Sequence, residues 1–481
     1  MAEPAFVDGF RLGRLRLIRL PPSSISLPAS GSKKPNTAQI ELAVGVTDDY
    51  GTDLMFDSVD LRIDVLDAGT LKRPTGVTFR LANSSSSSSS DSTSAIFSFS
   101  PSNGPFHTVK LSLSFQPSLT AGPIPPSLSF RLSVASPSPP TPTEASGATR
   151  CIRTLVGELD QAVLEMWDDK RYVLMSVRSG PVEVKSEGKE VKLASEKVQT
   201  TLRTIHLPST SLPPSDSAPS DPSSTSLPPS SSPRSISIVE RPGLNNSTGQ
   251  RLWDCAIGMS AFLSLFPHAL DAAAPLPAID SHGDEPSLKQ RRVESGVKGR
   301  RRRIRVVELG AGCALASMVA SRILESGSGA DTASVLATDV EATIETTLKE
   351  NLEANSAVEA VEAVEAAVLD WGELSQDTVD RVTQGKAHQS GTGGQDDETS
   401  LTLLATDVLY NPSSHDLLLS NLLSLLRPHS PSTTLAASRR ALIAYKRRTE
   451  GDDGFFSLAK DTGLEVTKVW EWGEVSVWSL V

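Results

Sequence analysis

The sequence predicts an α/β domain with a mostly parallel sheet in its C-terminal half, preceded by a smaller β-rich region. Strand-like and helix-like segments alternate from about residue 236 onward, which indicates a parallel sheet covered on both faces. Upstream, short stretches within 1–134 alternate apolar and polar residues in period two. Between these parts, 207–235 is almost entirely Ser, Pro, Thr and Asp, a composition typical of a linker.

The N-terminal region is expected to form a small antiparallel β module, whose function the sequence does not indicate. Period-two runs favour half-buried strands at 10–20, 40–46, 59–66 and 108–115, and 83–94 is a Ser-rich loop. Residues 150–206 add further strands, including a hairpin over 181–191. The sequence leaves open whether 1–134 and 150–206 form one module or two.

The domain expected over 236–481 shows five strand-like runs, each with the apolar character of a buried strand. These runs are 303–309, 335–339, 366–370, 401–406 and 441–445. Helical patterns occur at 251–266, 314–325, 344–352, 416–426 and 454–461. The runs 464–470 and 475–481 predict a terminal hairpin, and insertions are expected near 272–302 and 384–400.

Composition limits the classes of function. The net charge of −11 argues against general attraction to nucleic acid or anionic membranes, and no apolar run reaches membrane-spanning length. The three cysteines lie at neither metal-ligand nor disulfide spacing, so no metal is expected. With no pattern of a signal peptide, we expect a cytoplasmic protein, with nuclear entry left open.

One segment carries the pattern of a nucleoside-binding site. Gly310 and Gly312 follow a strand and precede a helix, so they permit a tight turn that approaches a ligand closely. Asp339 ends the next strand, where an acid can accept hydrogen bonds from both ribose hydroxyls. Together these features predict a nucleoside cofactor.

The same segment favours a sulfonium cofactor over a dinucleotide. Leu315 stands where a dinucleotide site would have its third glycine, and Glu308 would repel a pyrophosphate. An acid near a positively charged sulfonium is favourable instead. We therefore expect S-adenosyl-L-methionine as cofactor and a methyltransferase rather than a dehydrogenase.

Several motifs resemble methyltransferase family 16, whose members have a class I, Rossmann-like fold with a seven-stranded sheet. The matching segments are Gly249–Asp254, Val307–Gly312, Thr338-Asp339, Asp370–Gly372 and Ala405–Tyr410. The Asp407-x-x-Tyr410 segment resembles the Asp-x-x-Tyr motif of its protein-lysine methyltransferases, and 444–449 resembles the group that modifies valosin-containing protein. The resemblance covers about 236–481 and none of the N-terminal half.

The resemblance implies roles for individual residues. Around the cofactor it implies that Trp253 and Trp371 border the adenine, Asp370 lies near its amine, Asp339 binds the ribose, and Glu308, Gly310 and Gly312 line the methionine part, with Asp407 adjacent. On the acceptor side it implies Asp407, Tyr410 and Tyr445, which would orient an ammonium and hold it against ring faces. Core packing of either Trp and a purely structural Asp-x-x-Tyr segment are the alternatives.

The expected function is methyl transfer to a lysine of a non-histone protein by a monomeric enzyme. The alternatives are a catalytically weak interaction module and an enzyme that methylates a small molecule or an N-terminal amine. Ala314 stands where the family usually has Gly, which keeps the weak-binding alternative open. The basic segment 289–305 is either a solvated loop, a nuclear-import signal or a dock for an acidic partner.

Overall fold

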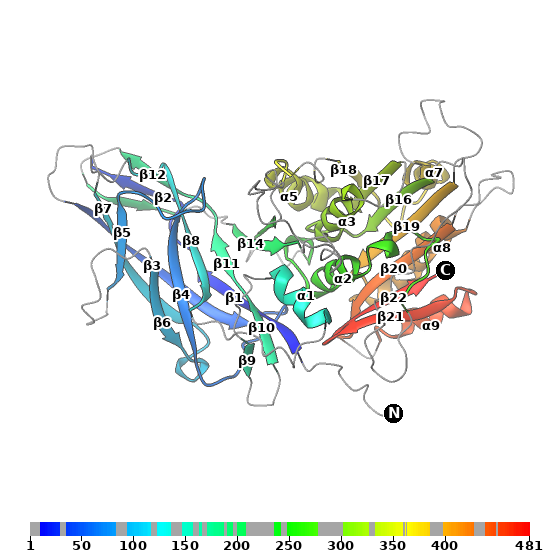
Figure 1. The fold of residues 1–481 in the computed structure, drawn as a ribbon, viewed down its shortest axis with the longest axis horizontal. Coiled ribbons are helices and arrows are strands. Elements are labelled where there is room, and N and C mark those ends of the chain that lie inside the picture. The colour runs from blue at the N-terminus through cyan, green and yellow to red at the C-terminus, as the bar shows by residue number, and fades with distance from the viewer. Residues whose placement is uncertain are drawn as a thin grey trace, which may run out of the picture.

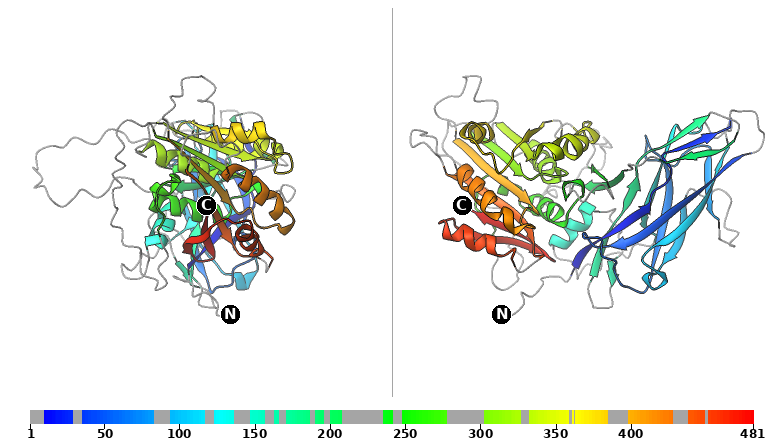
Figure 2. Two further views of the ribbon diagram at one scale, coloured as in Figure 1. Left: turned by 90° about the vertical axis from the view of Figure 1, so that its right-hand side faces the viewer. Right: turned by 180° about the vertical axis from the view of Figure 1, so that it is seen from behind.

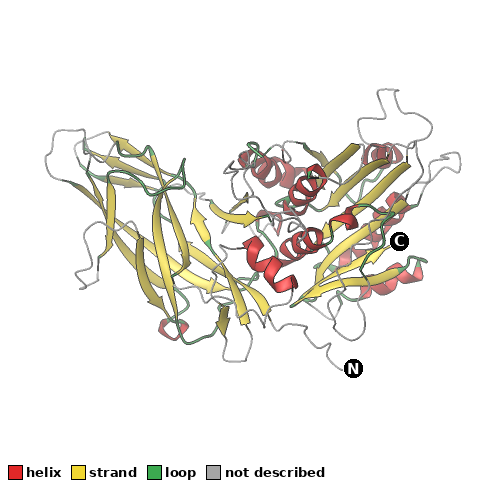
Figure 3. Ribbon diagram, in the orientation of Figure 1, coloured by secondary structure: helices red, strands yellow, loops and turns green. Residues whose placement is uncertain are grey.

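The computed structural model shows two lobes side by side, a β-rich lobe and a mixed α/β lobe (Figures 1 and 3). It describes residues 10–481 except for 29–34, 83–93, 117–122, 136–146, 157–162, 166–170, 187–189, 196–199, 208–234, 242–247, 278–301, 327–331, 359–360, 362, 385–397, 428–437 and 449–450. Most of the predicted linker, of both insertions and of the basic segment 289–305 therefore lies outside the described residues. In the described part, no helix is long and apolar enough to cross a membrane.

The N-terminal lobe contains two β-sheets. The first has the strand order β5-β7-β3-β1-β10-β9. Its strands are β1 (Phe10–Arg19), β3 (Asn36–Thr47), β5 (Val77–Leu81), β7 (His107–Phe115), β9 (Val163–Glu165) and β10 (Arg171–Met175). The second has the order β13-β2-β12-β8-β11-β14-β15. In addition, β4 pairs with β8 of this sheet, and β6 pairs with β4. Its strands are β2 (Ser24–Leu27), β4 (Val59–Asp67), β6 (Ser94–Phe99), β8 (Ser127–Val134), β11 (Val177–Ser179), β12 (Val182–Ser186), β13 (Lys192–Ala194), β14 (Thr201–His206) and β15 (Ser235–Glu240).

These two sheets share one apolar core. Alternate residues of β4, namely Leu61, Ile63 and Val65, are buried in it, as period-two strands require. The core also receives side chains from β1, β3, β7, β8 and β10, which come from both sheets. Strands from 1–134 and from 171–186 thus contribute to the same core.

The C-terminal lobe is built on a seven-stranded sheet of order β18-β17-β16-β19-β20-β22-β21. The strands are β16 (Arg302–Leu309), β17 (Thr332–Asp339), β18 (Val364–Val368), β19 (Glu398–Thr406), β20 (Ser438–Lys446), β21 (Val466–Trp472) and β22 (Val475–Leu480). The first five strands pair in parallel, whereas β22 runs antiparallel between β20 and β21. The predicted terminal hairpin is present, and its second strand is the one inserted into the sheet.

Helices cover both faces of this sheet (Figure 2). One face packs against α2 (Asp254–Leu265), α3 (Leu315–Glu325) and the helical segment Glu341–Ala354, which comprises α4 (Glu341–Thr343), a π-helical turn (Ile344–Leu348) and α5 (Lys349–Ala354). The other face packs against α7 (Gln376–Gln384), α8 (His415–Leu426) and α9 (Gly454–Asp461). Consecutive residues divide between the faces: Val306 belongs to the first core and Val307 to the second.

The two lobes are joined by elements that belong to both. Helix α1 (Gly147–Val156) packs on α2, with Ile152 and Leu155 fully buried in the core of the C-terminal lobe. Strand β15 pairs antiparallel with β14 in the N-terminal sheet, whereas 236 was expected to begin the C-terminal domain. Its Ile236 and Ile238 face the C-terminal core, which explains why the sequence pattern changes there.

Asn351 of α5 and Asn355, which directly follows α5, fix this junction to the C-terminal lobe. Asn351 accepts a hydrogen bond from Val239 N at 2.7 Å, and Asn355 accepts one from Ser237 N at 2.8 Å. Both side-chain amides also donate to carbonyls of the same strand. The free backbone N–H and C=O groups of Ser237 and Val239 at the edge of β15 therefore form hydrogen bonds with side chains of the neighbouring lobe, and not with another strand.

Candidate functional site

A cavity of about 650 Å³ opens at the C-terminal edge of the parallel strands, a size usual for small-molecule sites. Residues from four strand ends line it: Gly310 and Gly312 after β16, Asp339 at the end of β17, Trp371 after β18, and Asp407 after β19. Ligands of open α/β sheets bind at this edge. Most of the residues expected in a cofactor site are thus brought together here.

The Gly310-Ala311-Gly312 turn forms one wall of the cavity. Gly310 and Gly312 have φ values of 67° and 52°, a left-handed conformation that glycine adopts without steric cost. A Cβ atom at Gly310 would lie 3.0 Å from Val408 Cγ1, so this position is also closely packed. Ala314, directly before α3, is left-handed as well at φ 59°, which explains why glycine would be favoured there.

Asp339 lines the cavity and braces the turn. Its Oδ2 accepts a hydrogen bond from Gly312 N at 2.8 Å, and its Oδ1 accepts one from Val340 N at the same distance. Burial raises the pKa of this carboxyl above its usual value, against the effect of these hydrogen bonds. Backbone hydrogen bonds therefore hold the Asp339 carboxylate in place in the cavity wall.

Glu308 was expected to line the cofactor site, but it does not line the cavity. Its side chain is fully buried beneath the turn, where Oε2 accepts hydrogen bonds from Ser317 N at 2.9 Å and Ser317 Oγ at 2.6 Å. Oε1 lies 3.4 Å from the Thr406 hydroxyl. Burial raises the pKa of Glu308 to about 7. Glu308 therefore caps the first turn of α3 and supports the turn from below.

Trp253, Asp370 and Trp371 all line the cavity. The indole of Trp253 donates to Thr248 O at 2.7 Å, which fixes the ring just before α2 begins. Asp370 is exposed and accepts a hydrogen bond from Gly372 N at 2.8 Å, which closes the turn after β18. The backbone oxygen of Trp371 accepts a hydrogen bond from Asn421 of α8 at 2.9 Å.

Asp407 lies in the cavity wall in a left-handed conformation, with φ 59°. Its Oδ2 accepts a short hydrogen bond from Arg448, and its Oδ1 accepts one from Cys255 Sγ at 3.4 Å. Burial raises the pKa of Asp407 to about 6, while Arg448 acts in the opposite direction. An arginine thus neutralises the acid that was expected to face the acceptor.

The two tyrosines expected on the acceptor side lie in different places. Tyr410 lines the cavity, is 47% exposed, and its hydroxyl lies 3.3 Å from Thr248 Oγ1. Tyr445 does not line the cavity: it is buried against Phe456 on the α8–α9 side of the sheet, and its hydroxyl donates to Asp453 at 2.8 Å. The structure therefore does not bring Tyr445 together with Asp407 and Tyr410.

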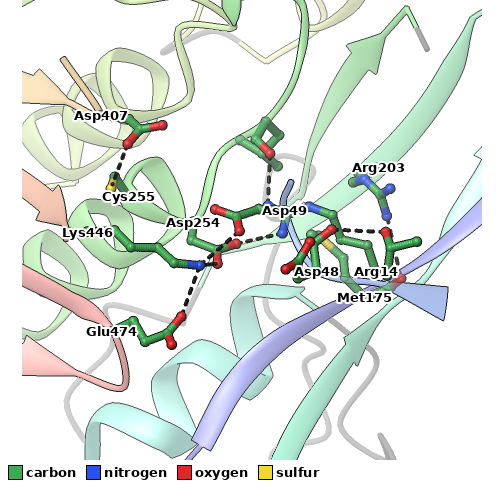
Figure 4. A network of polar contacts seen from close by, with 12 residues as sticks. Arg14, Asp48, Asp49, Met175, Arg203, Asp254, Cys255, Asp407, Lys446 and Glu474 are labelled. Atoms are coloured by element: carbon green, nitrogen blue, oxygen red, sulfur yellow. Dashed lines mark hydrogen bonds and ion pairs between the residues drawn. The ribbon is translucent and has the colours of Figure 1, made fainter. Parts of the chain in front are cut away.

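A buried charge network joins the two lobes beside the cavity (Figure 4). Lys446 Nζ lies 2.8 Å from Asp49 Oδ1 and 3.0 Å from Asp254 Oδ2, and Glu474 is at 3.1 Å. Arg14 completes the network at 2.7 Å from Asp254 Oδ1. Burial opposes the charge on Lys446, yet its carboxylate partners raise its pKa above the usual value.

Sequence reasoning missed Arg448 and the contribution of the N-terminal lobe. Arg448 lies within the segment 444–449 that resembles the family, but Tyr445 was the residue of this segment that was predicted to face the acceptor. In the region that the structure describes, no three His, Cys, Asp or Glu side chains come together as a metal site would need. All three cysteines are buried and unpaired.

The comparisons with known proteins agree with the resemblance expected from the sequence. Residues 232–385 match the methyltransferase family 16 model, which describes lysine methyltransferases. The match includes the Gly310–Gly312 turn, Asp339 and Trp371, and it ends before Asp407. No curated protein matches the chain significantly.

Among solved structures, methyltransferases show a partial likeness. The N,N-8-amino-8-demethyl-D-riboflavin dimethyltransferase RosA from Streptomyces davawensis is 13% identical with a TM-score of 0.23, over 37% of this chain and 48% of its own. A predicted O-methyltransferase from Agrobacterium tumefaciens is 14% identical with a TM-score of 0.23, over 37% and 72%. The N-terminal domain of human METTL16, solved with SAH, is 13% identical with a TM-score of 0.24, over 38% and 60%. This chain thus spans less than half the length of RosA, and scores this low carry no conclusion about its activity.

Proposed function

We propose, from the match of residues 232–385 to lysine methyltransferases, that this chain transfers methyl groups from S-adenosyl-L-methionine to a lysine of a non-histone protein. The observation that carries the proposal is the cavity at the C-terminal edge of the sheet. Its lining combines the Gly310–Gly312 turn and Asp339 with Asp407 and Tyr410. The seven-stranded sheet with its terminal hairpin supports the class I fold that the sequence resemblance implies.

The residues at the cavity fit the proposed cofactor. Asp339 would hold the ribose hydroxyls, and Gly310 lets the turn pack closely against Val408 and Trp371 because it has no Cβ. Trp371 and Trp253 would border the adenine, with Asp370 near its amine. When bound, the cofactor supplies a methyl group on a positively charged sulfur, which the carboxylates of this cavity favour electrostatically.

The acceptor side has the groups needed to position an amine. Methyl transfer is an in-line displacement, so orientation of the amine and exclusion of water are the main contributions of the protein. Asp407 supplies a carboxylate whose charge Arg448 balances, and the exposed ring of Tyr410 provides a face beside it. An acceptor lysine must lose its proton, and removal of the amine from water favours this step because it disfavours the charged ammonium form.

The test is transfer of a labelled methyl group from the cofactor by the full chain. We expect label in lysate proteins, and mass spectrometry of the labelled proteins should find methyllysine. Asp339→Ala should abolish both transfer and binding of S-adenosylhomocysteine in calorimetry. Asp377→Ala, which removes an exposed acid in the first turn of α7, is the matched control and should keep both.

Three results would contradict the proposal in different ways. Absence of S-adenosylhomocysteine binding by the intact chain would favour an interaction module over an enzyme. Label that appears only in small molecules would place the substrate in another class. Label on N-terminal amines alone would retain protein methylation but exclude lysine.

A further inference from the structure

The N-terminal lobe reaches the candidate site through the turn that follows β3. Within this turn Asp48 N donates to Thr52 O at 3.0 Å, and Thr52 N donates to the Asp48 carboxylate at 2.8 Å. Asp49 is buried and pairs with Lys446 of the C-terminal lobe. Tyr50, the next residue, is thus held in place by a hydrogen-bonded turn on one side and a buried ion pair on the other.

The ring of Tyr50 lies beside Arg448, which pairs with Asp407 on the acceptor side of the cavity. Its centroid is 4.9 Å from the Arg448 guanidinium carbon and 6.4 Å from the centroid of Trp253. Arg448 is also 4.8 Å from the ring of Trp253, so two aromatic rings contact a single cation. Tyr50 nevertheless remains 46% exposed, so much of its ring can contact another molecule.

A second cavity of about 360 Å³ lies between the lobes next to this ring. Its walls come from both lobes and include Leu12, Tyr50, Tyr172, Lys446, Arg448 and Glu474. Arg448 lines this cavity and the larger one, so the two cavities are neighbours. A polypeptide that lies in the second cavity would therefore contact Tyr50 and Arg448, and Arg448 pairs directly with Asp407 of the larger cavity.

We propose that Tyr50 is a specificity-determining residue of the acceptor site, against which the cationic side chain of a polypeptide bound between the lobes packs. The inference rests on the proposed function and adds that the N-terminal lobe forms part of the acceptor site. Arg448 and Lys446 lie 4.9 and 5.5 Å from the centroid of this ring, so the ring accepts cations at its face. A lysine ammonium is attracted to an aromatic face by the same interaction.

The experiment measures initial rates of tritiated methyl transfer into a dialysed cell lysate at increasing lysate protein concentration, with saturating cofactor. Tyr50→Ala should raise the half-saturating lysate concentration about two- to thirtyfold, the range of cation–π contributions. Tyr50→Phe should stay within about twofold of the parent because the ring face is retained. Phe106→Ala, which removes another exposed aromatic ring of the N-terminal lobe, is the matched control and should change nothing.

Two further readouts separate an acceptor role from a structural one. Binding of S-adenosylhomocysteine and the unfolding midpoint should be the same in Tyr50→Ala and the parent. A fall in both together with transfer would overturn the inference, as would unchanged half-saturation in Tyr50→Ala. In those cases the proposed function still stands, whereas a parent chain that labels no protein would overturn both.

Discussion

The buried acid Glu308 gives the sharpest prediction about stability. Its carboxyl has a pKa of about 7 because burial disfavours the charged form, whereas an exposed glutamate titrates near 4.5. A raised folded-state pKa means that the folded chain holds the proton more tightly than the unfolded chain. The contribution of Glu308 to stability is therefore full below about pH 4.5 and is lost as the pH rises to about 7.

The magnitude follows from the shift. A difference of one pKa unit is about 1.36 kcal/mol, so the contribution should fall by about 2.5 kcal/mol between pH 5 and pH 8. Glu308→Gln removes this titration and keeps an oxygen that can accept from Ser317. We expect the stability of the variant relative to the parent to increase by about that amount over this range.

The assay is urea unfolding of both proteins at several pH values, with the difference in unfolding free energy plotted against pH. Taking the difference removes the contributions of other carboxyls with raised pKa, such as Asp407. A difference that stays constant from pH 5 to pH 8 would refute the reasoning. It would mean that Glu308 is ionised throughout, or that its surroundings admit water.

Three further predictions concern single residues. Lys446→Met leaves Asp49 and Asp254 buried without their shared cation, and should reduce the free energy of unfolding by about 3–5 kcal/mol; a loss below about 1 kcal/mol in urea unfolding would contradict the network. Ala314→Gly relieves a left-handed alanine, and should raise stability by about 0.5–1 kcal/mol after the entropy of the unfolded glycine is subtracted. Tyr445→Phe should leave methyl transfer within about twofold of the parent, because its hydroxyl contacts Asp453 outside the cavity; loss of activity in kinetic assays would place Tyr445 in the site after all.

The strands and turn of the C-terminal lobe could be predicted because their signals are local. The period of the apolar residues predicts each element, and the glycines at 310 and 312 stand where a left-handed backbone is required. Asp339 could be placed because the ends of parallel strands meet at one edge of the sheet. The strand expected at 366–370 was placed two residues late, since β18 covers Val364–Val368.

Residues near the end of β20 were harder to place, because the face of the sheet to which each side chain points decides its neighbours. Tyr445 and Lys446 are adjacent in β20, so their side chains point to opposite faces of the sheet. Lys446 shares its face with Ala444 and meets Asp254 of α2, whereas Tyr445 meets Phe456 of α9. Ala444 belongs to the core beside α2, so a period of two predicts that Lys446 and not Tyr445 points to that face. Applied beyond the strand end, the same period would also have indicated Arg448.

The contribution of the N-terminal lobe could not be predicted from a single sequence. Asp49 and Lys446 are 397 residues apart and form an ion pair only after both lobes have folded. Glu308 could be seen as an acid near the turn, but its burial beneath α3 depends on tertiary packing. Contacts of this kind have no periodic or local signal.

The pairing of β14 with β15 changes what the Ser- and Pro-rich segment between them connects. His206 and Ser235 are direct partners in the ladder, so the chain leaves and re-enters at the same place. β14 and β15 are therefore the two strands of a hairpin within the N-terminal sheet, so the chain is still in that sheet where β15 begins. The spacing of the lobes is set instead by α1, β15 and the buried charges around Lys446.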